Sequence, residues 1–128
     1  MKNSIGILLI AILVGISCKS KVTNQETGAT VKDVDVVEAR KMITENKDLV
    51  ILDVRTPEET NQGTIDKAMI IDFYDEKFEA KLSILDKSKP YLVYCRSGGR
   101  SSTASNKMIE LGFKDVTNME GGYTAWSK

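Results

Sequence analysis

Strand-like and helix-like segments alternate along residues 31–128, and this alternation constrains the fold more than any other feature of the sequence. Short apolar runs rich in β-branched residues are each followed by a stretch in which apolar side chains recur at helical spacing. A chain that alternates strands and helices in this way forms a mainly parallel sheet with helices packed on both faces. We therefore predict an α/β fold of three layers.

Local signals define most of the expected elements. The predicted strands cover residues 31–34, 49–54, 68–71, 91–94 and 115–119, and the predicted helices cover 36–45, a short piece after Thr56, 75–85, 101–111 and a last turn around Trp126. Two of the predicted helices begin with a capping pattern. Asp35 is the expected cap of one, with Glu38 three residues later, and Thr56 is the expected cap of the other, with Pro57 in the first helical position and Glu59 three residues after the cap. The run 49–54 is apolar almost throughout, which indicates an interior strand buried on both faces.

The segment Cys95–Ser101, with the sequence Cys-Arg-Ser-Gly-Gly-Arg-Ser, has the pattern of an anion-binding loop around a nucleophile. It follows the apolar run Tyr91–Tyr94 and opens a helical pattern. A strand, a tight loop and a helix N-terminus turn backbone N–H groups inward, and the helix dipole adds about half a positive charge. Such a loop stabilises a thiolate, so we predict Cys95 as the catalytic nucleophile. Its place after a parallel strand is where sites form in such sheets.

The rest of the loop is predicted to bind substrate through its backbone and its two cationic side chains. Glycines permit close backbone approach and positive φ angles, and the two arginines offset the charge of an anionic donor. The predicted substrate-binding residues are Arg96, Ser97, Gly98, Gly99, Arg100 and Ser101. We expect Asp53 and Arg55, at the end of an earlier strand, to brace the neighbouring loops through charge-assisted hydrogen bonds.

Composition excludes several classes of function. The chain has 128 residues, of which 41% are hydrophobic and 28% charged, so one globular domain is expected. Its formal net charge is zero, which gives no sign of nucleic-acid binding. It contains no histidine, so a Ser-His-Asp triad, a Cys-His pair and a histidine-rich metal site are excluded. We predict no metal and no cofactor, and a monomer.

The N-terminus has the pattern of an export signal. A short stretch carrying Lys2 precedes the apolar run Ile5–Ile16, which is short for a membrane span. The segment Gly15–Cys18 resembles the lipobox of bacterial lipoproteins, although Gly15 departs from the larger aliphatic residue usual there. We expect residues 1–17 to be a signal peptide. Cys18 would then be lipidated and become the mature N-terminus.

This interpretation places the domain outside the cytoplasm. Residues 18–30, the lipidated cysteine and a polar stretch, would tether a domain of residues 31–128 to a membrane of the bacterial cell envelope, with the domain in the periplasm. Two alternatives remain for the N-terminus: an uncleaved hydrophobic anchor, or a disulfide between Cys18 and Cys95. The polar stretch argues against pairing, and an acylated Cys18 would leave Cys95 as the only free thiol.

Three segments resemble the signature segments of single-domain rhodanese-like sulfurtransferases. They are Leu52–Glu59, Cys95–Ser101, and Glu120–Gly122 with Ala125–Trp126. The resemblance spans nearly all of residues 31–128. It implies a rhodanese-like α/β/α fold with a mainly parallel five-stranded sheet and a persulfide on Cys95 during turnover. It also implies a small anionic sulfur donor, such as thiosulfate or a persulfide, and a thiol-type acceptor.

The sequence departs from that family at one segment. Residues 63–68 read Gly-Thr-Ile-Asp-Lys-Ala, where the family usually has Gly-His-Ile-x-Gly-Ala. Thr64 and Lys67 therefore replace a histidine and a glycine. Neither position takes part in the chemistry that the resemblance implies, so we expect the change to affect the turn and the rim of the pocket.

Two other functions are weighed against sulfur transfer. One is a non-catalytic rhodanese-like module that binds a partner protein, although such modules often lack the cysteine that this chain keeps. The other is a cysteine phosphatase or arsenate reductase, whose loops have five residues between the cysteine and the arginine. Here four residues separate Cys95 from Arg100. The shorter loop suits a single sulfur better than a tetrahedral phosphate.

Overall fold

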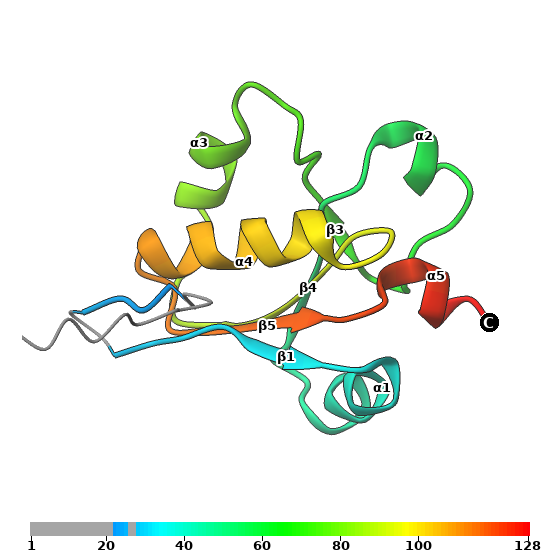
Figure 1. Cartoon of the computed structure of the whole chain (residues 1–128), viewed down its shortest axis with the longest axis horizontal. Helices are drawn as coiled ribbons and strands as arrows, with labels where there is room; N and C mark the ends of the chain where they lie inside the picture. The colour runs from blue at the N-terminus through cyan, green and yellow to red at the C-terminus, as the bar shows by residue number, and fades with distance from the viewer. Residues whose placement is uncertain (1–21, 26–27) are drawn as a thin grey trace, which may run out of the picture.

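The computed structural model describes residues 22–25 and 28–128, in which a five-stranded parallel sheet lies between two layers of helices (Figure 1). This arrangement confirms the predicted α/β fold. The strands are β1 (Lys32–Val34), β2 (Val50–Asp53), β3 (Met69–Ile70), β4 (Pro90–Tyr94) and β5 (Asp115–Met119), and the helices are α1 (Val36–Glu45), α2 (Pro57–Thr60), α3 (Phe78–Ser83), α4 (Gly99–Glu110) and α5 (Gly122–Trp126).

Strand β4 is the centre of the sheet, whose order is β1-β5-β4-β2-β3. All neighbouring pairs are parallel, and Val93 of β4 lies in register with Leu52 of β2 and with Asn118 of β5. Because parallel strands end at the same edge, the residue after β4 lies in the middle of the carboxyl edge of the sheet. That residue is Cys95.

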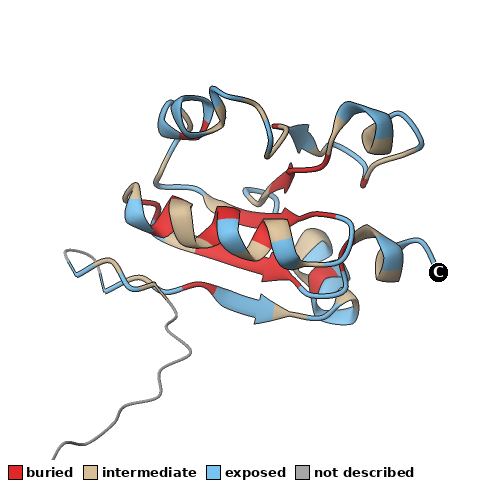
Figure 2. Ribbon diagram, turned by 45° about the horizontal axis from the view of Figure 1, so that its top comes forward, coloured by how far each residue is buried: buried red, intermediate tan, exposed pale blue. Residues whose placement is uncertain are grey.

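The core has two parts, one on each face of the sheet. Tyr91 and Val93 of β4 pack toward α3 and α4, whereas Leu92 and Tyr94 pack toward α1 and α5. The alternation follows from the pleat of a strand, which turns successive side chains to opposite faces. Figure 2 shows the buried central strands beneath α4. This packing on both faces fixes the position of the carboxyl end of β4.

The two predicted helix starts are confirmed. Asp35 caps α1, with its side chain accepting a hydrogen bond of 2.8 Å from the Glu38 N–H. Thr56 caps α2 in the same way, accepting from the Glu59 N–H at 3.4 Å, and Pro57 is the first helical residue. The second cap places α2 directly beyond the end of β2.

The predicted helix over residues 75–85 is shorter in the structure, where α3 spans only Phe78–Ser83. At its start, the Asp75 side chain accepts a hydrogen bond from the Lys77 N–H, and this local contact forms a turn in place of a helical first turn. At its end, Ile84 is 84% exposed, and the Leu85 N–H bonds to the Leu82 carbonyl in a tighter turn, although the Leu85 side chain packs on the core as predicted.

Two other boundaries also differ from the prediction. The strand expected over residues 68–71 is reduced to Met69–Ile70, an exposed edge strand, because the Ala68 N–H bonds to the Ile65 carbonyl in a turn. Helix α4 begins at Gly99, two residues before the predicted Ser101, because Gly98 takes a φ of +107° and turns the chain directly into the helix.

The described N-terminal residues lie against the end of the domain opposite to the Cys95 loop (Figure 1). Val22 and Ala29 pack on the core, and the Asn24 amide donates a hydrogen bond of 3.0 Å to the Ile109 carbonyl. Contacts with the domain therefore begin before Val31, inside the stretch assigned above to the tether.

The predicted signal peptide, residues 1–17, and the predicted lipidation site, Cys18, lie outside the described residues. Within the described part of the chain, no helix has the length and apolar character needed to cross a membrane.

Candidate active site

Cys95 follows β4 directly and lies at the floor of the loop that joins this strand to α4. Cys95 is only 1% exposed to solvent, and among the described residues it forms no disulfide. The sulfur Sγ accepts a hydrogen bond from the Gly98 N–H at 3.1 Å, and the Ser101 hydroxyl lies 3.3 Å from it. The loop thus wraps around the sulfur and directs hydrogen-bond donors toward it.

These donors favour the thiolate. Burial raises the pKa of Cys95, because it removes water from the charged form. Hydrogen bonds from the Ser101 side chain and from the N–H groups of Ser101, Gly98 and Ser97 oppose this effect, and the net result is a lowered pKa. The N-terminus of α4 adds a favourable dipole. Cys95 is therefore suited to act as a nucleophile without a neighbouring base.

Arg100 does not extend freely into the loop. Its Nη1 and Nη2 donate to the two carboxylate oxygens of Glu59 at 2.8 and 2.9 Å, and its guanidinium lies 5.7 Å from the Tyr74 ring centre. The Arg100 hydrogen bond lowers the pKa of Glu59, and the Glu59 hydrogen bond raises the pKa of Arg100. The negative charge of Cys95 also raises the pKa of Arg100, so this cation still acts on the sulfur, although Glu59 largely compensates its charge.

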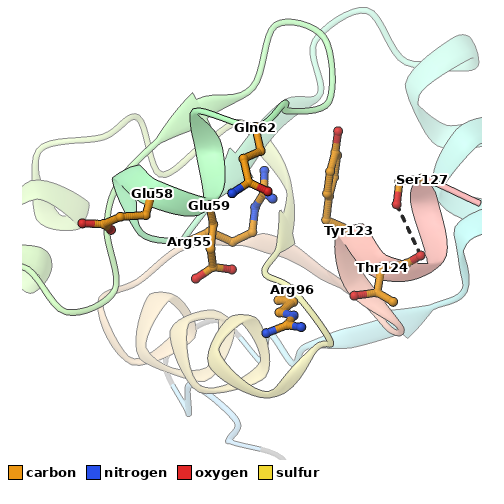
Figure 3. A pocket seen from close by; sticks show the side chains of 8 residues that line it. All are labelled: Arg55, Glu58, Glu59, Gln62, Arg96, Tyr123, Thr124 and Ser127. Carbon is orange, nitrogen blue, oxygen red and sulfur yellow. Dashed lines mark hydrogen bonds between the residues drawn. The ribbon is translucent and has the colours of Figure 1, made fainter.

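Arg96 is exposed and lines a pocket of about 640 Å³ beside the loop (Figure 3). The lining residues are Arg55, Glu58, Glu59, Gln62, Arg96, Tyr123, Thr124 and Ser127. They come from α2 and the residues beside it, from the loop and from α5. This pocket has room for more than a small inorganic anion.

Asp53 and Arg55 form a buried ion pair at the end of β2. The Arg55 Nη2 donates to Asp53 Oδ2 at 2.7 Å, and the Arg55 Nε donates to Asp53 Oδ1 at 3.0 Å. Nη2 also donates to the Gly63 carbonyl at 2.7 Å, and the guanidinium lies 4.1 Å from the Tyr123 ring centre. Burial lowers the pKa of Arg55, but Asp53 and Tyr94 together raise it by more. The pair therefore connects three parts of the chain: the end of β2, the turn after α2 through Gly63, and α5 through Tyr123.

Comparison with known proteins identifies the family. A model of the rhodanese-like domain matches residues 35–128. The chain belongs to the rhodanese-like domain family.

Relatives and solved structures agree with this assignment over most of the chain. The Bacillus subtilis protein YtwF is 38% identical over 96 residues, which are 75% of this chain and 90% of that protein. The thiosulfate sulfurtransferase GlpE of Coxiella burnetii is 32% identical, with 74% and 86% of the two chains covered. The crystal structure of a rhodanese-like domain protein from Staphylococcus aureus superposes with a TM-score of 0.64 at 33% identity, covering 74% of this chain and 90% of that one.

The two loop glycines of this rhodanese-like domain differ in their surroundings. Gly98 has a φ of +107°, and a Cβ there would lie 3.5 Å from the Gly121 nitrogen. A Cβ at Gly99 would meet no heavy atom within 4 Å. The 3.5 Å separation is an ordinary contact, so the positive φ, and not crowding, accounts for glycine at position 98, and neither accounts for glycine at position 99.

The family departure at Lys67 has a visible consequence. Lys67 takes a φ of +63° and is the only residue other than glycine with a positive φ in the described part of the chain. A side chain at such an angle is strained, and glycine relieves that strain. The turn thus keeps the backbone shape that suits the family's usual glycine.

Several residues that shape the site were not predicted from the sequence. Glu59 was assigned to a helix start, but its carboxylate holds Arg100, which lies 41 positions further along the chain. The N–H groups of Tyr123 and Thr124 bond to the carbonyls of Cys95 and Arg96. The signals that could have found these contacts are the acidic residue in the first turn of α2 and the glycine pair at the start of α5.

Proposed function

We propose that this protein is a sulfurtransferase that carries a sulfane sulfur as a persulfide on Cys95. One observation carries the proposal: Sγ of Cys95 lies at the centre of the carboxyl edge and is held by the Gly98 N–H at 3.1 Å and the Ser101 hydroxyl at 3.3 Å. Donors of this kind stabilise negative charge on sulfur both before and after it gains a second sulfur atom.

The reaction has two steps that balance without an added oxidant or reductant. In the first, the Cys95 thiolate attacks the outer sulfur of thiosulfate, a sulfur–sulfur bond forms, the bond to the sulfonate sulfur breaks, and sulfite leaves with that electron pair. In the second, an acceptor thiolate attacks the outer sulfur of the Cys95 persulfide. The acceptor leaves as a persulfide, and the Cys95 thiolate is restored.

Three features support this reaction class and these substrates. Relatives are named sulfurtransferases, and one of them, the Coxiella burnetii protein, is named for thiosulfate. Arg96 brings an exposed positive charge to the pocket beside the sulfur, which favours a small anionic donor. The pocket of about 640 Å³ is larger than such a donor needs, so it also has room for an organic thiol as acceptor.

A direct test follows thiocyanate formation from thiosulfate and cyanide with the full chain and its Cys95→Ser variant. We expect turnover by the unmodified chain and none by the variant. After treatment with thiosulfate alone, the intact protein should gain the mass of one sulfur atom, and a peptide map should assign the gain to Cys95. A protein that neither turns over nor gains this mass with thiosulfate or a persulfide donor would be a non-catalytic binding module.

We also propose that the protein is exported and anchored to a bacterial membrane by a lipid on Cys18, with its domain in the periplasm as a monomer. The proposal rests on the apolar run Ile5–Ile16 and the lipobox-like segment Gly15–Cys18. Cells fed a labelled fatty acid should label the unmodified protein and not the Cys18→Ala variant. Labelling of both proteins, or of neither, would reject lipidation at Cys18.

A further inference from the structure

Helix α5 contacts the back of the Cys95 loop through two hydrogen bonds. The Tyr123 N–H donates to the Cys95 carbonyl at 2.8 Å, and the Thr124 N–H donates to the Arg96 carbonyl at 3.0 Å. Both N–H groups belong to the first turn of α5, where backbone donors have no partner within the helix. The first turn therefore takes up two carbonyls of the loop.

Holding a carbonyl also orients the N–H on the other side of the same peptide. The peptide unit is planar and trans, so its C=O and N–H point in opposite directions. The Arg96 carbonyl and the Ser97 N–H share one such unit. Because Thr124 holds the carbonyl on the α5 side, the Ser97 N–H faces the opposite side. The next N–H along the loop, that of Gly98, donates to Sγ at 3.1 Å, and both N–H groups lower the pKa of Cys95. The Arg96 N–H likewise points away from α5.

Gly122 lets α5 come this close. A Cβ at this position would lie 2.4 Å from the Cys95 oxygen and 2.5 Å from both the carbonyl carbon and the oxygen of Arg96. These are backbone atoms, so no side chain can rotate aside to make room. Its φ of +56° adds a second reason for glycine. Any larger residue must push α5 and the loop apart.

We propose that α5 is the positioning element of the sulfur-binding loop. Its Tyr123 and Thr124 amides hold two loop carbonyls, so that the loop keeps its N–H groups turned toward Sγ, and Gly122 permits this contact. The inference goes beyond the proposed function, because it concerns how the loop is held whatever the sulfur donor is. It predicts that a change in α5 makes the Cys95 thiolate less stable, although every residue of the loop stays the same.

The first test compares Gly122→Ala with Gly112→Ala. Gly112 also has a positive φ, +98°, but its Cβ would meet only a side-chain carbon of Lys87 at 3.7 Å, far from the loop, so this variant controls for backbone strain. The readout is the rate of Cys95 alkylation by iodoacetamide as a function of pH, with the Cys18→Ala background leaving one thiol. It needs no sulfur transfer, so it stays informative if the proposed function fails.

For Gly122→Ala we expect the midpoint of the pH profile to move to higher pH. The rate at pH 7 should fall about threefold, because the thiolate fraction drops about tenfold while the intrinsic nucleophilicity of a more basic thiol rises. Gly112→Ala should lower thermal stability and leave the profile unchanged. The charged groups around the loop, Arg96 at the pocket and Arg100 paired with Glu59 of α2, are the same in both variants. Equal profiles for the two variants would overturn the proposal.

A second variant decides the matter if Gly122→Ala does not fold. Replacing Thr124 by its α-hydroxy acid turns one amide into an ester. It deletes the N–H that bonds to the Arg96 carbonyl and makes the Tyr123 carbonyl, which accepts from the Ser127 N–H, a weaker acceptor. The same ester at Thr103, whose N–H lies inside α4, is the control for ester chemistry. We expect the profile to shift upward for the ester at Thr124 and to stay in place for the control. An unshifted profile at Thr124 would show that α5 does not orient the loop.

Discussion

The buried ion pair between Asp53 and Arg55 makes a quantitative prediction about what holds the carboxyl edge together. The variant Asp53→Asn keeps the size of the side chain and removes its charge. The Arg55 guanidinium would remain, with a side chain only 4% exposed and no carboxylate to compensate it. Its hydrogen bond to the Gly63 carbonyl does not neutralise the charge. The variant therefore leaves a buried cation without a counter-ion.

Removing one partner of a buried pair costs about 3 to 5 kcal/mol. Most of this penalty comes from the unpaired charge and not from the lost attraction. For a domain of this size, each kcal/mol lowers Tm by about 4 to 8 °C, so we expect Asp53→Asn to lower Tm by about 12 to 40 °C. The surface pair Lys32–Asp115 serves as comparison. Its Nζ and Oδ1 atoms lie 3.8 Å apart, and its side chains are 70% and 47% exposed. Asp115→Asn should change stability by less than about 0.5 kcal/mol.

Urea unfolding followed by circular dichroism measures these differences. The set includes Asp53→Asn, Arg55→Met and the double variant, which removes both charges together. We expect the double variant to be more stable than the sum of the single changes predicts, by at least about 1 kcal/mol. The reasoning is refuted if Asp53→Asn loses less than about 1 kcal/mol, or if the single changes simply add.

Three further predictions concern the loop and its surroundings. Ser101→Ala removes the hydroxyl 3.3 Å from Sγ, so the pH midpoint of Cys95 alkylation should rise and the rate at pH 7 should fall about threefold. Arg100 lowers the pKa of Glu59, so this pair stabilises the fold above the ordinary carboxyl pKa of 4.5 and loses its contribution as pH falls through the lower folded value. In urea titrations Glu59→Gln should therefore lose less stability than the unmodified chain between pH 7 and pH 3, by about 1 kcal/mol; an equal loss would contradict the pairing. Lys67→Gly should raise the free energy of unfolding by about 0.5 to 1 kcal/mol, because it relieves strain at a φ of +63°, and a lower value would speak against that strain.

Elements defined by local signals could be predicted from the sequence. Asp35 and Thr56 were identified as caps because a cap and its partner N–H lie three residues apart. The apolar runs gave the interior strands for the same local reason. Elements defined by their surroundings were placed less well. Strand β3 is two residues long because it is an exposed edge, and α3 ends at Ser83, beyond which the Leu85 N–H bonds to the Leu82 carbonyl in a tighter turn.

The same distinction applies to the candidate site. Cys95 and its loop are contiguous, so the pattern of cysteine, glycines and arginines was visible in the sequence. The partner of Arg100 was not, because Glu59 belongs to a different element and only the fold brings the two together. Backbone donors are the hardest to predict, since any residue other than proline carries an N–H. Of the contacts made by α5, only Gly122 leaves a trace in the sequence, as a position where no side chain fits.

The charges around the sulfur divide the work of the site between two sets of groups. Of the arginines near the loop, Arg55 is paired with Asp53 and Arg100 with Glu59, whereas Arg96 is exposed at the pocket. Uncharged donors, the Gly98 N–H and the Ser101 hydroxyl, contact the sulfur directly. Thiolate formation should therefore depend mainly on these aimed donors, and attraction of an anionic donor mainly on Arg96.

This division can be tested with Arg96→Ala, using Arg96→Lys as the charge-preserving control. Because the side chain is exposed, its attraction for a dianion is worth about 1 kcal/mol, so kcat/KM for thiosulfate should fall about fivefold in the alanine variant and by less in the lysine variant. Added salt should lower kcat/KM for thiosulfate more in the unmodified protein than in Arg96→Ala, because salt screens the charge that the variant lacks. Alkylation by the neutral reagent iodoacetamide should keep its pH profile in all three proteins. A parallel loss of alkylation and thiosulfate turnover in Arg96→Ala would mean that this side chain stabilises the thiolate itself, and that the aimed donors do not suffice.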